Sequence, residues 1–172
     1  QPLRTTGMLQ VFNDDSDSTE ELHFIADDQT TTYLFRVDDV FAIQNTSITT
    51  YGSLVDTASA TLTGTTPQFA VLWDSGALDL YQANTLTLYR HLNYSSPGGT
   101  LNDVPYAIVP FLNDSHAGDQ FAVVYRSWTG DNPSNYICMV DSTTTTVGEP
   151  PTFYVPDDHV TRVFHRDADN DG

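Results

Sequence analysis

The stretch Phe69-Ala-Val-Leu-Trp73, Asp74-Ser-Gly76, Leu78-Asp-Leu-Tyr-Gln82 decides the fold class, because it places two short apolar segments on either side of a turn sequence. Segments of this length that are rich in Val, Leu, Tyr and Phe fit a pleated, half-buried strand. Asp, Ser and Gly are residues that favour tight turns. The stretch therefore predicts two neighbouring strands of an antiparallel sheet.

The same strand-like periodicity continues along most of the chain. One segment competes as a helix. It begins at Ser18-Thr-Glu-Glu21 with capping-box spacing, and Leu22, Ile25 and Ala26 follow at helical spacing. Strands do not alternate with long helices, which excludes a parallel α/β fold. The further predicted strands are 7–12, 31–37, 40–44, 47–51, 58–63, 85–92, 106–112, 121–127, 136–141, 143–147, 152–155 and 159–165.

These strands predict one all-β domain over residues 1–172, with extended or acidic ends at 1–6 and 166–172. The preferred fold is an antiparallel β-sandwich or jelly-roll barrel with short hairpins, because eight core strands and a few accessory ones suit this length. The alternative is a four-bladed, propeller-like meander. Segments 40–51 and 78–89 share the pattern Gln-x-x-(Ser/Thr)-(Ile/Leu)-Thr-x-Tyr, and propeller blades average about 40–45 residues.

The charge inventory is strongly acidic. Six basic residues, all Arg, stand against 23 acidic ones, and the formal net charge is -17. Such a chain repels nucleic acids and anionic lipid surfaces, which excludes both as partners. Its hydrophobic fraction of 39% is too high for a disordered acidic tail. The absence of Lys indicates adaptation to molar salt, which screens the self-repulsion. An ordinary acidic secreted protein or a calcium binder is the alternative.

Several features indicate a location outside a cell or on a virion. The chain starts at Gln1, as a processed or a trimmed chain would, and carries acceptor sequons at Asn45, Asn93 and Asn113. No segment approaches the 18 apolar residues of a membrane span, so membrane insertion is not expected. Cys138 is the single cysteine, which excludes an internal disulfide, and its apolar surroundings predict a buried thiol.

The sharpest ligand motif is acidic. Asp167, Asp169 and Asp171, followed by Gly172, match the front half of a calcium-binding loop, with carboxylates at positions 1, 3 and 5 and Gly at 6. The remaining ligands of a Ca²⁺ ion would come from elsewhere in the fold or from a neighbouring subunit. The alternative is simply an acidic terminus. A second cluster, at residues 13–17, is interpreted as a solvated turn.

Catalytic motifs are missing from the sequence. It has no GxSxG or HExxH motif and no Gly-rich phosphate loop, so we expect that the protein is not an enzyme. A hydrolase that uses paired Asp residues is the weaker alternative. Trp73 and Trp128 each end an apolar strand. They suit core or rim positions, and they are also the candidate aromatic residues for facing a ligand.

Together these observations predict a non-enzymatic structural or assembly protein that is exposed in a high-salt setting. The most concrete form is a capsid or head-decoration protein of a virus with a salt-loving host, and its partners would be copies of itself and other capsid or surface proteins. The alternatives are an S-layer or surface-filament domain and a calcium-dependent adhesin or carbohydrate-binding module that binds glycans.

Overall fold

The computed structural model describes residues 4–15, 17, 19–62, 66–96, 103–111, 118–129, 132–148 and 152–155, without the side chains of 4–7, 127–129, 132–134 and 152–155. These residues form strands, turns and loops, so the all-β prediction is confirmed. Within the described residues, no helix is long and apolar enough to cross a membrane.

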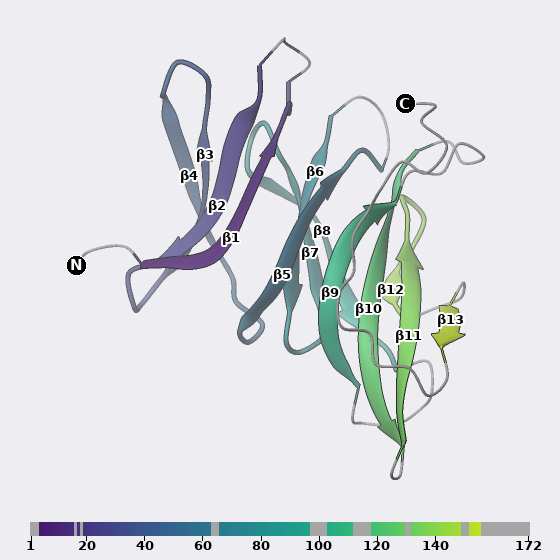
Figure 1. The fold of residues 1–172 in the computed structure, drawn as a ribbon. Helices are drawn as coiled ribbons and strands as arrows, with labels where there is room; N and C mark the ends of the chain where they lie inside the picture. Colours follow the sequence, from purple (N-terminus) through teal and green to yellow (C-terminus); the bar gives the residue numbers. More distant parts are fainter. Residues whose placement is uncertain are drawn as a thin grey trace.

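The strands form three sheets (Figure 1). The first sheet comprises β1 (Arg4–Phe12), β2 (Glu21–Asp27), β3 (Thr32–Val37) and β4 (Ile43–Ile48). The middle sheet comprises β5 (Leu54–Ala60), β6 (Gln68–Trp73), β7 (Leu78–Gln82), β8 (Thr87–Tyr94) and the two-residue β12 (Thr146–Val147). The third sheet comprises β9 (Val104–Phe111), β10 (Gln120–Thr129), β11 (Asn132–Val140) and β13 (Thr152–Val155).

Strand order within each sheet largely follows the sequence. The first sheet has the order β1-β2-β3-β4, the middle sheet runs from β5 to β8, and all of these pairs are antiparallel. The exception is β12. It lies between β11 and β13 in the sequence, but it pairs in parallel with β8 of the middle sheet. The described part of the chain thus has three sheets, whereas a sandwich or jelly roll was expected to have two.

The helix considered from Ser18 is not formed in the part of this segment that the structure describes, because residues 21–27 form strand β2. This strand pairs with β1 on one side and β3 on the other, and its buried positions alternate from Glu21 to His23 to Ile25. Pairing on both sides outweighs the local capping signal. The carboxylate of Glu21 accepts the backbone N–H of Asp14 instead of capping a helix.

The repeat pattern shared by 40–51 and 78–89 does not correspond to a shared structure. Residues 43–48 form the single strand β4, after a turn in which Phe41 has a φ of 61°. The other segment spans β7, a turn and most of β8. The separate strands expected at 40–44 and 47–51 are therefore replaced by one strand.

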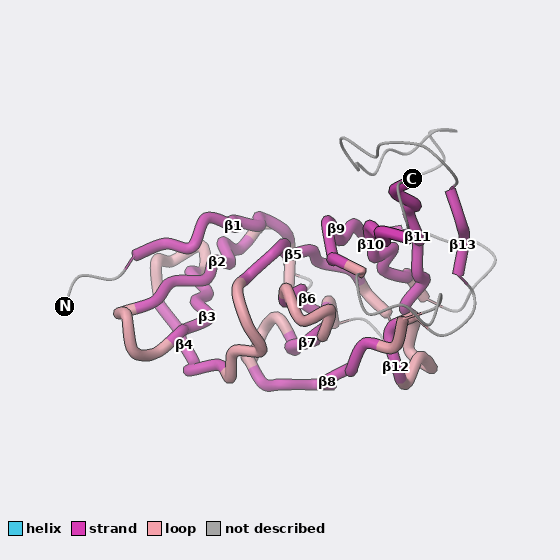
Figure 2. The backbone as a smooth tube through the Cα atoms, turned by 90° about the horizontal axis from the view of Figure 1, so that it is seen from below, coloured by secondary structure: helices cyan, strands magenta, loops and turns pink. Residues whose placement is uncertain are grey.

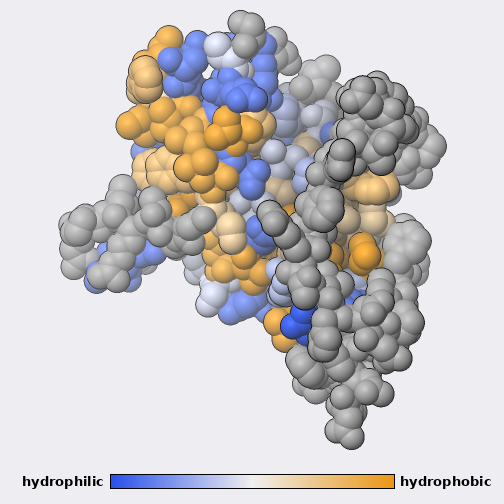
Figure 3. All heavy atoms as spheres, in the orientation of Figure 1, coloured by the Kyte–Doolittle hydropathy of each residue, from blue (hydrophilic) through white to orange (hydrophobic). Residues whose placement is uncertain are grey.

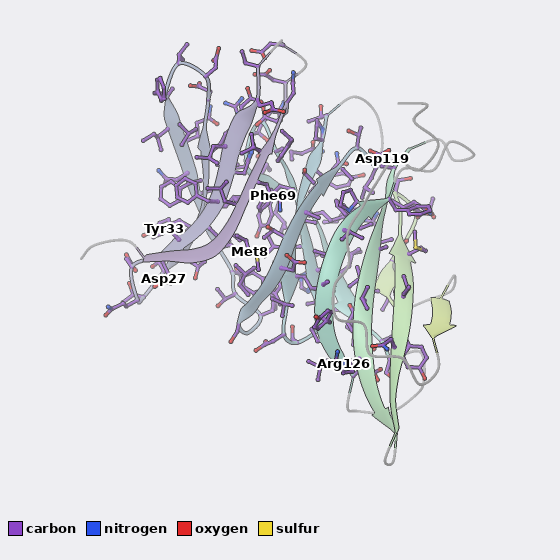
Figure 4. The ribbon with its side chains drawn as sticks, in the orientation of Figure 1. Met8, Asp27, Tyr33, Phe69, Asp119 and Arg126 are labelled. Atoms are coloured by element: carbon purple, nitrogen blue, oxygen red, sulfur yellow. The ribbon has the colours of Figure 1, made fainter. Side chains whose placement is uncertain are left out.

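The middle sheet is covered on both faces, as Figure 2 shows from below. Strand β6 is buried along its whole length. Phe69, Val71 and Trp73 belong to the core shared with the first sheet, and Phe69 is labelled between these sheets in Figure 4. Ala70 and Leu72 belong to the core shared with the third sheet. The near-continuous apolar run of β6 is the composition expected of a strand buried on both faces.

Side-chain hydrogen bonds join the first strands of the three sheets. Gln10 on β1 donates from Nε2 to the carbonyl oxygen of Thr57 on β5 at 3.0 Å. Asp56 on β5 accepts the backbone N–H of Ile108 on β9 at 3.0 Å. Burial raises the pKa of Asp56, although the N–H groups of Ile108 and Thr57 offset part of this effect. The three strands therefore lie in succession and are joined by polar groups.

Candidate functional site

The predicted calcium ligands and one sequon lie outside the described residues. These are Asp167, Asp169, Asp171 and Asn113. The other two sequon residues are exposed on strands, Asn45 on β4 and Asn93 on β8. Both positions are accessible to a modifying group.

The two tryptophans differ in what the structure describes. Trp73 is 1% exposed, and its indole Nε1 donates to Asp79 Oδ2 at 2.8 Å. Its ring therefore contributes to the core and supports a carboxylate, and does not provide an open surface for stacking. Trp128 lies in β10, opposite Pro133, and its side chain is outside the described residues.

The acidic cluster at residues 13–17 is only partly the solvated turn that the sequence predicted. Asp15 and Asp17 are exposed, but Asp14 is fully buried. Arg36 on β3 donates to both oxygens of Asp14, from Nε at 2.5 Å and from Nη2 at 2.7 Å. His23 Nε2 lies 3.0 Å from Asp14 Oδ2. The prediction is wrong for Asp14 because a basic residue 22 positions later reaches it across the sheet.

In this cluster the pKa of Asp14 is lowered and the pKa of its neighbour Glu21 is raised. Burial alone would raise the pKa of Asp14, but the hydrogen bonds from His23 and Arg36 and the charge of Arg36 outweigh it, and the pKa is lowered. Burial raises the pKa of Glu21, against the hydrogen bond from the Asp14 N–H. Its Oε1 is buried without a hydrogen-bond partner. Ionisation is therefore favoured at Asp14 and disfavoured at Glu21.

Carboxylate oxygens of Asp14, Asp15 and Glu21 lie within 4.8 Å of one another, a spacing that a metal ion could bridge. The Arg36 guanidinium already occupies this space, because its Nη2 donates to Asp14 and also to Asp15, at 3.2 Å. A fixed positive charge competes with a cation for the same oxygens. We therefore interpret the cluster as a buried charge network that joins β1, β2 and β3.

A pocket of about 310 Å³ opens between the first and middle sheets. One wall is β4 and the loop that follows it, and the other is the β7–β8 hairpin. Most lining side chains carry a hydroxyl group or an aromatic ring, and one is a carboxylate. The lining residues are Thr46, Ser47, Ile48, Thr49, Tyr51, Asp79, Tyr81, Thr85, Leu86, Thr87 and Leu88.

Asp79 is the buried carboxylate of this pocket. Its Oδ1 lies 2.6 Å from Nδ1 of His91 on β8, and its Oδ2 accepts the indole N–H of Trp73. The Tyr51 ring stacks on the His91 ring at a centroid distance of 4.2 Å. Burial, and then the charge of Asp79, raise the pKa of Tyr81, which keeps its hydroxyl protonated. The carboxylate is therefore held in one orientation beside two tyrosines.

Sequence reasoning did not single out this pocket. The available signal was Asp79 itself, a lone charge between Leu78 and Leu80 in an apolar strand. A buried charge in such a position requires partners. Its partner His91 lies one strand away, and no local pattern in the sequence links the two residues. Tyr51 comes from a loop whose position the sequence does not specify.

The outer face of the first sheet is a second candidate, for assembly. Two cross-strand rows lie on this face, and we call them the end face: Val11–Leu22–Val37–Ile43 and Leu9–Phe24–Phe35–Asn45. Leu9 is 60% exposed and Ile43 is 65% exposed. Phe24 and Phe35 stack at 4.9 Å. Apolar residues gather over this sheet at the upper left of Figure 3. The end face is thus uncharged and largely apolar, and its positions on the outer strands β1 and β4 are open to solvent.

Comparisons with protein-family models, curated proteins and solved structures find no match to this chain. The functional argument therefore rests on the end face and the pocket.

Proposed function

We propose that this protein is a non-enzymatic structural module that assembles with copies of itself through the end face. The observation that carries the proposal is the contrast between sheets. Strand β6 of the middle sheet is buried by apolar neighbours on both faces, whereas Leu9, Val11 and Ile43 on the outer face of the first sheet are 60%, 51% and 65% exposed. A contiguous apolar surface of this kind is typical of an interaction site.

A second copy is the occupant that best fits the end face. The chain already covers its apolar sheet faces with other antiparallel sheets. A twofold contact would place the same face on both partners, as in most homodimers. The two rows of the end face contain no charged residue. An uncharged apolar face is the composition expected of the centre of such an interface.

Charge at the ends of the first sheet makes this assembly dependent on salt. Asp27, Asp28, Asp38 and Asp39 lie at the strand ends and turns, and Asp27 is labelled there in Figure 4. Hydrogen bonds from Thr30 and Thr31 lower the pKa of Asp28 to about 2, so its charge persists at physiological pH. Two copies, each with a net charge of -17, repel at low ionic strength. Molar salt reduces the Debye length to about 3 Å and removes most of this repulsion.

For the detailed architecture, we propose a propeller-like arrangement in preference to a jelly roll. In this arrangement each sheet is one antiparallel meander, and the meanders pack against one another. The first strands of the three sheets begin at Arg4, Leu54 and Val104, at intervals of 50 residues. Each sheet is built mainly from consecutive antiparallel strands. A jelly roll instead exchanges strands between two sheets. The regular spacing and the joined first strands support a repeated unit.

The setting that we propose is the exterior of a virion or cell in high salt, with a viral capsid or head-decoration protein as its most concrete form. The acidic, Lys-free composition supports it. Ca²⁺ binding at Asp167, Asp169 and Asp171 stays a prediction. An S-layer or surface-filament domain would use the same end face, so it remains the alternative within this class.

The test is the mass of the particle in solution. We expect sedimentation velocity to show a monomer in dilute buffer and a dimer or larger regular oligomers in molar NaCl, with or without millimolar CaCl₂. Ile43→Asp places a charge on the end face and should keep the chain monomeric. Val104→Asp, at an exposed position on β9, is the matched control and should still assemble. A stable monomer at every salt and calcium concentration, or unchanged assembly of Ile43→Asp, would exclude the proposal.

A further inference from the structure

We propose that the pocket between β4 and the β7–β8 hairpin binds a neutral sugar unit. This site is separate from the end face, because it opens between the first and middle sheets. Its volume of about 310 Å³ lies at the lower limit of small-molecule pockets and suits a single monosaccharide ring.

The hydroxyl groups of the lining match the chemistry of a sugar. Thr46, Thr49, Thr85 and Thr87 line the pocket, from both of its walls. Each hydroxyl can donate one hydrogen bond and accept others, as each sugar hydroxyl can. A ring held between the walls would therefore find polar partners on both sides without any charged group.

Asp79 supplies a fixed acceptor at the base of this arrangement. An ionised carboxylate offers about four lone-pair sites, and His91 and Trp73 each occupy one, on different oxygens. The remaining sites can accept sugar hydroxyl protons. Because both oxygens are already held by N–H groups, the carboxylate is preorganised for this role and poorly suited to ligating a metal ion.

Tyr51 supplies the apolar contact that a sugar ring also requires. The side chain is 38% exposed, and its ring is fixed by stacking on His91 and by an edge contact with Trp73. An aromatic ring held by its neighbours offers contact area at low entropic cost. Tyr51 thus provides the aromatic surface that the sequence assigned to Trp73.

The charge of the lining argues against other ligand classes. Among the described lining residues there is no Lys or Arg, and Asp79 carries the one acidic side chain, so an anion would be repelled. Bonds to His91 and Trp73 reduce the attraction that Asp79 can offer to an ammonium group. A neutral, hydroxyl-rich ligand is the class that remains.

The experiment is an NMR titration of the whole chain in molar NaCl with the methyl glycosides of glucose, galactose, mannose and N-acetylglucosamine. We expect saturable shifts at the amides of Thr49, Tyr51 and Thr85 with at least one glycoside, and a Kd in the millimolar range. Thr49→Val should weaken this binding about fivefold by removing one hydrogen bond. Tyr51→Ala should weaken it about tenfold by removing the aromatic contact.

Thr50→Val is the matched control, because Thr50 is exposed beside Thr49 but does not line the pocket. It should bind as the unmodified chain does. The proposal would be overturned by the absence of saturable shifts with all four glycosides, or by equal affinities of the Thr49→Val, Tyr51→Ala and Thr50→Val variants. Saturable binding of tetramethylammonium at these amides without binding of any glycoside would also overturn it.

Discussion

Arg36 and Asp14 form a buried bidentate ion pair, in which the guanidinium of β3 holds both carboxylate oxygens of the loop after β1. The two residues are 22 positions apart in a sequence that contains only six basic residues. One of these few bases is therefore used to neutralise a buried acid and to fix the loop between β1 and β2 against the sheet.

Removing the charge of Asp14 should destabilise the fold strongly. Asp14→Asn removes the bidentate partner of the buried Arg36 guanidinium, which keeps only its longer contacts with Asp15 and Asp38, and this should cost about 3 kcal/mol at pH 7. Urea denaturation at constant ionic strength measures this loss. The exposed Asp39→Asn variant is the control and should change stability by less than about 0.5 kcal/mol.

The effect of Asp14→Asn should also depend on pH. The folded pKa of Asp14 is lowered, so its stabilising effect is present above the ordinary value of 3.8 and is lost as the pH falls through the folded pKa. The difference between the variant and the unmodified chain should therefore shrink in acid. A constant difference from pH 7 down to the acid transition would contradict this account.

Glu21→Gln should stabilise the protein at neutral pH. Burial raises the folded pKa of Glu21, so the favourable contribution of the protonated side chain is complete below the ordinary value of 4.5 and is lost as the pH rises through the folded pKa. The glutamine side chain can still accept the Asp14 N–H but carries no charge to bury. We expect a higher urea midpoint than that of the unmodified chain at pH 7 and equal midpoints near pH 4. A lower midpoint at pH 7 would show that ionised Glu21 is favourable.

The hydrogen bond of the Tyr125 hydroxyl should stabilise the packing of the third sheet on the middle sheet. It is buried and donates to the carbonyl oxygen of Gly76 at 3.0 Å, in the turn between β6 and β7. Tyr125→Phe would leave that carbonyl without this donor and should cost about 1 kcal/mol in urea denaturation. Tyr89→Phe, at an exposed position on β8, should be neutral. Equal effects of the two variants would exclude a structural role for this bond.

A bulky group at Asn45 should block assembly, because Asn45 ends one row of the end face. Asn45→Cys coupled to maleimide-polyethylene glycol should stay monomeric in molar NaCl. The native Cys138 is fully buried and should not react. The same group on Asn93→Cys, on the middle sheet, should leave assembly intact. Oligomers of the Asn45 conjugate would show that the interface lies elsewhere.

Local sequence patterns predicted the strands well where pairing partners are close in sequence. Strand β7 has its predicted bounds, and β6 differs by one residue, because their turn is encoded by the residues between them. The segment after Ser18 was ambiguous because capping and strand signals coincide there, and only its pairing with β1 and β3 decides between them. The number of sheets depends on contacts between strands far apart in the sequence.

The candidate sites were harder to predict for the same reason. Asp14 and Asp79 are two of many acids in the chain. Asp79 stands out locally because it lies between Leu78 and Leu80, but nothing local distinguishes Asp14 from the exposed acids. Their burial depends on Arg36 and on His91 with Trp73, which are brought to them by sheet formation. The end face could likewise not be predicted. The sequence indicates which residues are apolar, but it does not indicate which face of a sheet is covered by a neighbouring sheet.

The consecutive strand order of the sheets has a kinetic consequence. Nearly all pairing within the first sheet, and among β5 to β8, joins strands separated only by short loops. Hairpins with such local contacts form quickly, and an emerging chain can complete them in order of synthesis. The apolar outer side of β1 to β4 would then be exposed on the nascent chain before the later sheets exist. Premature pairing between neighbouring nascent chains is thus the main hazard during synthesis, and the acidic strand ends, which repel one another most at low ionic strength, would delay it.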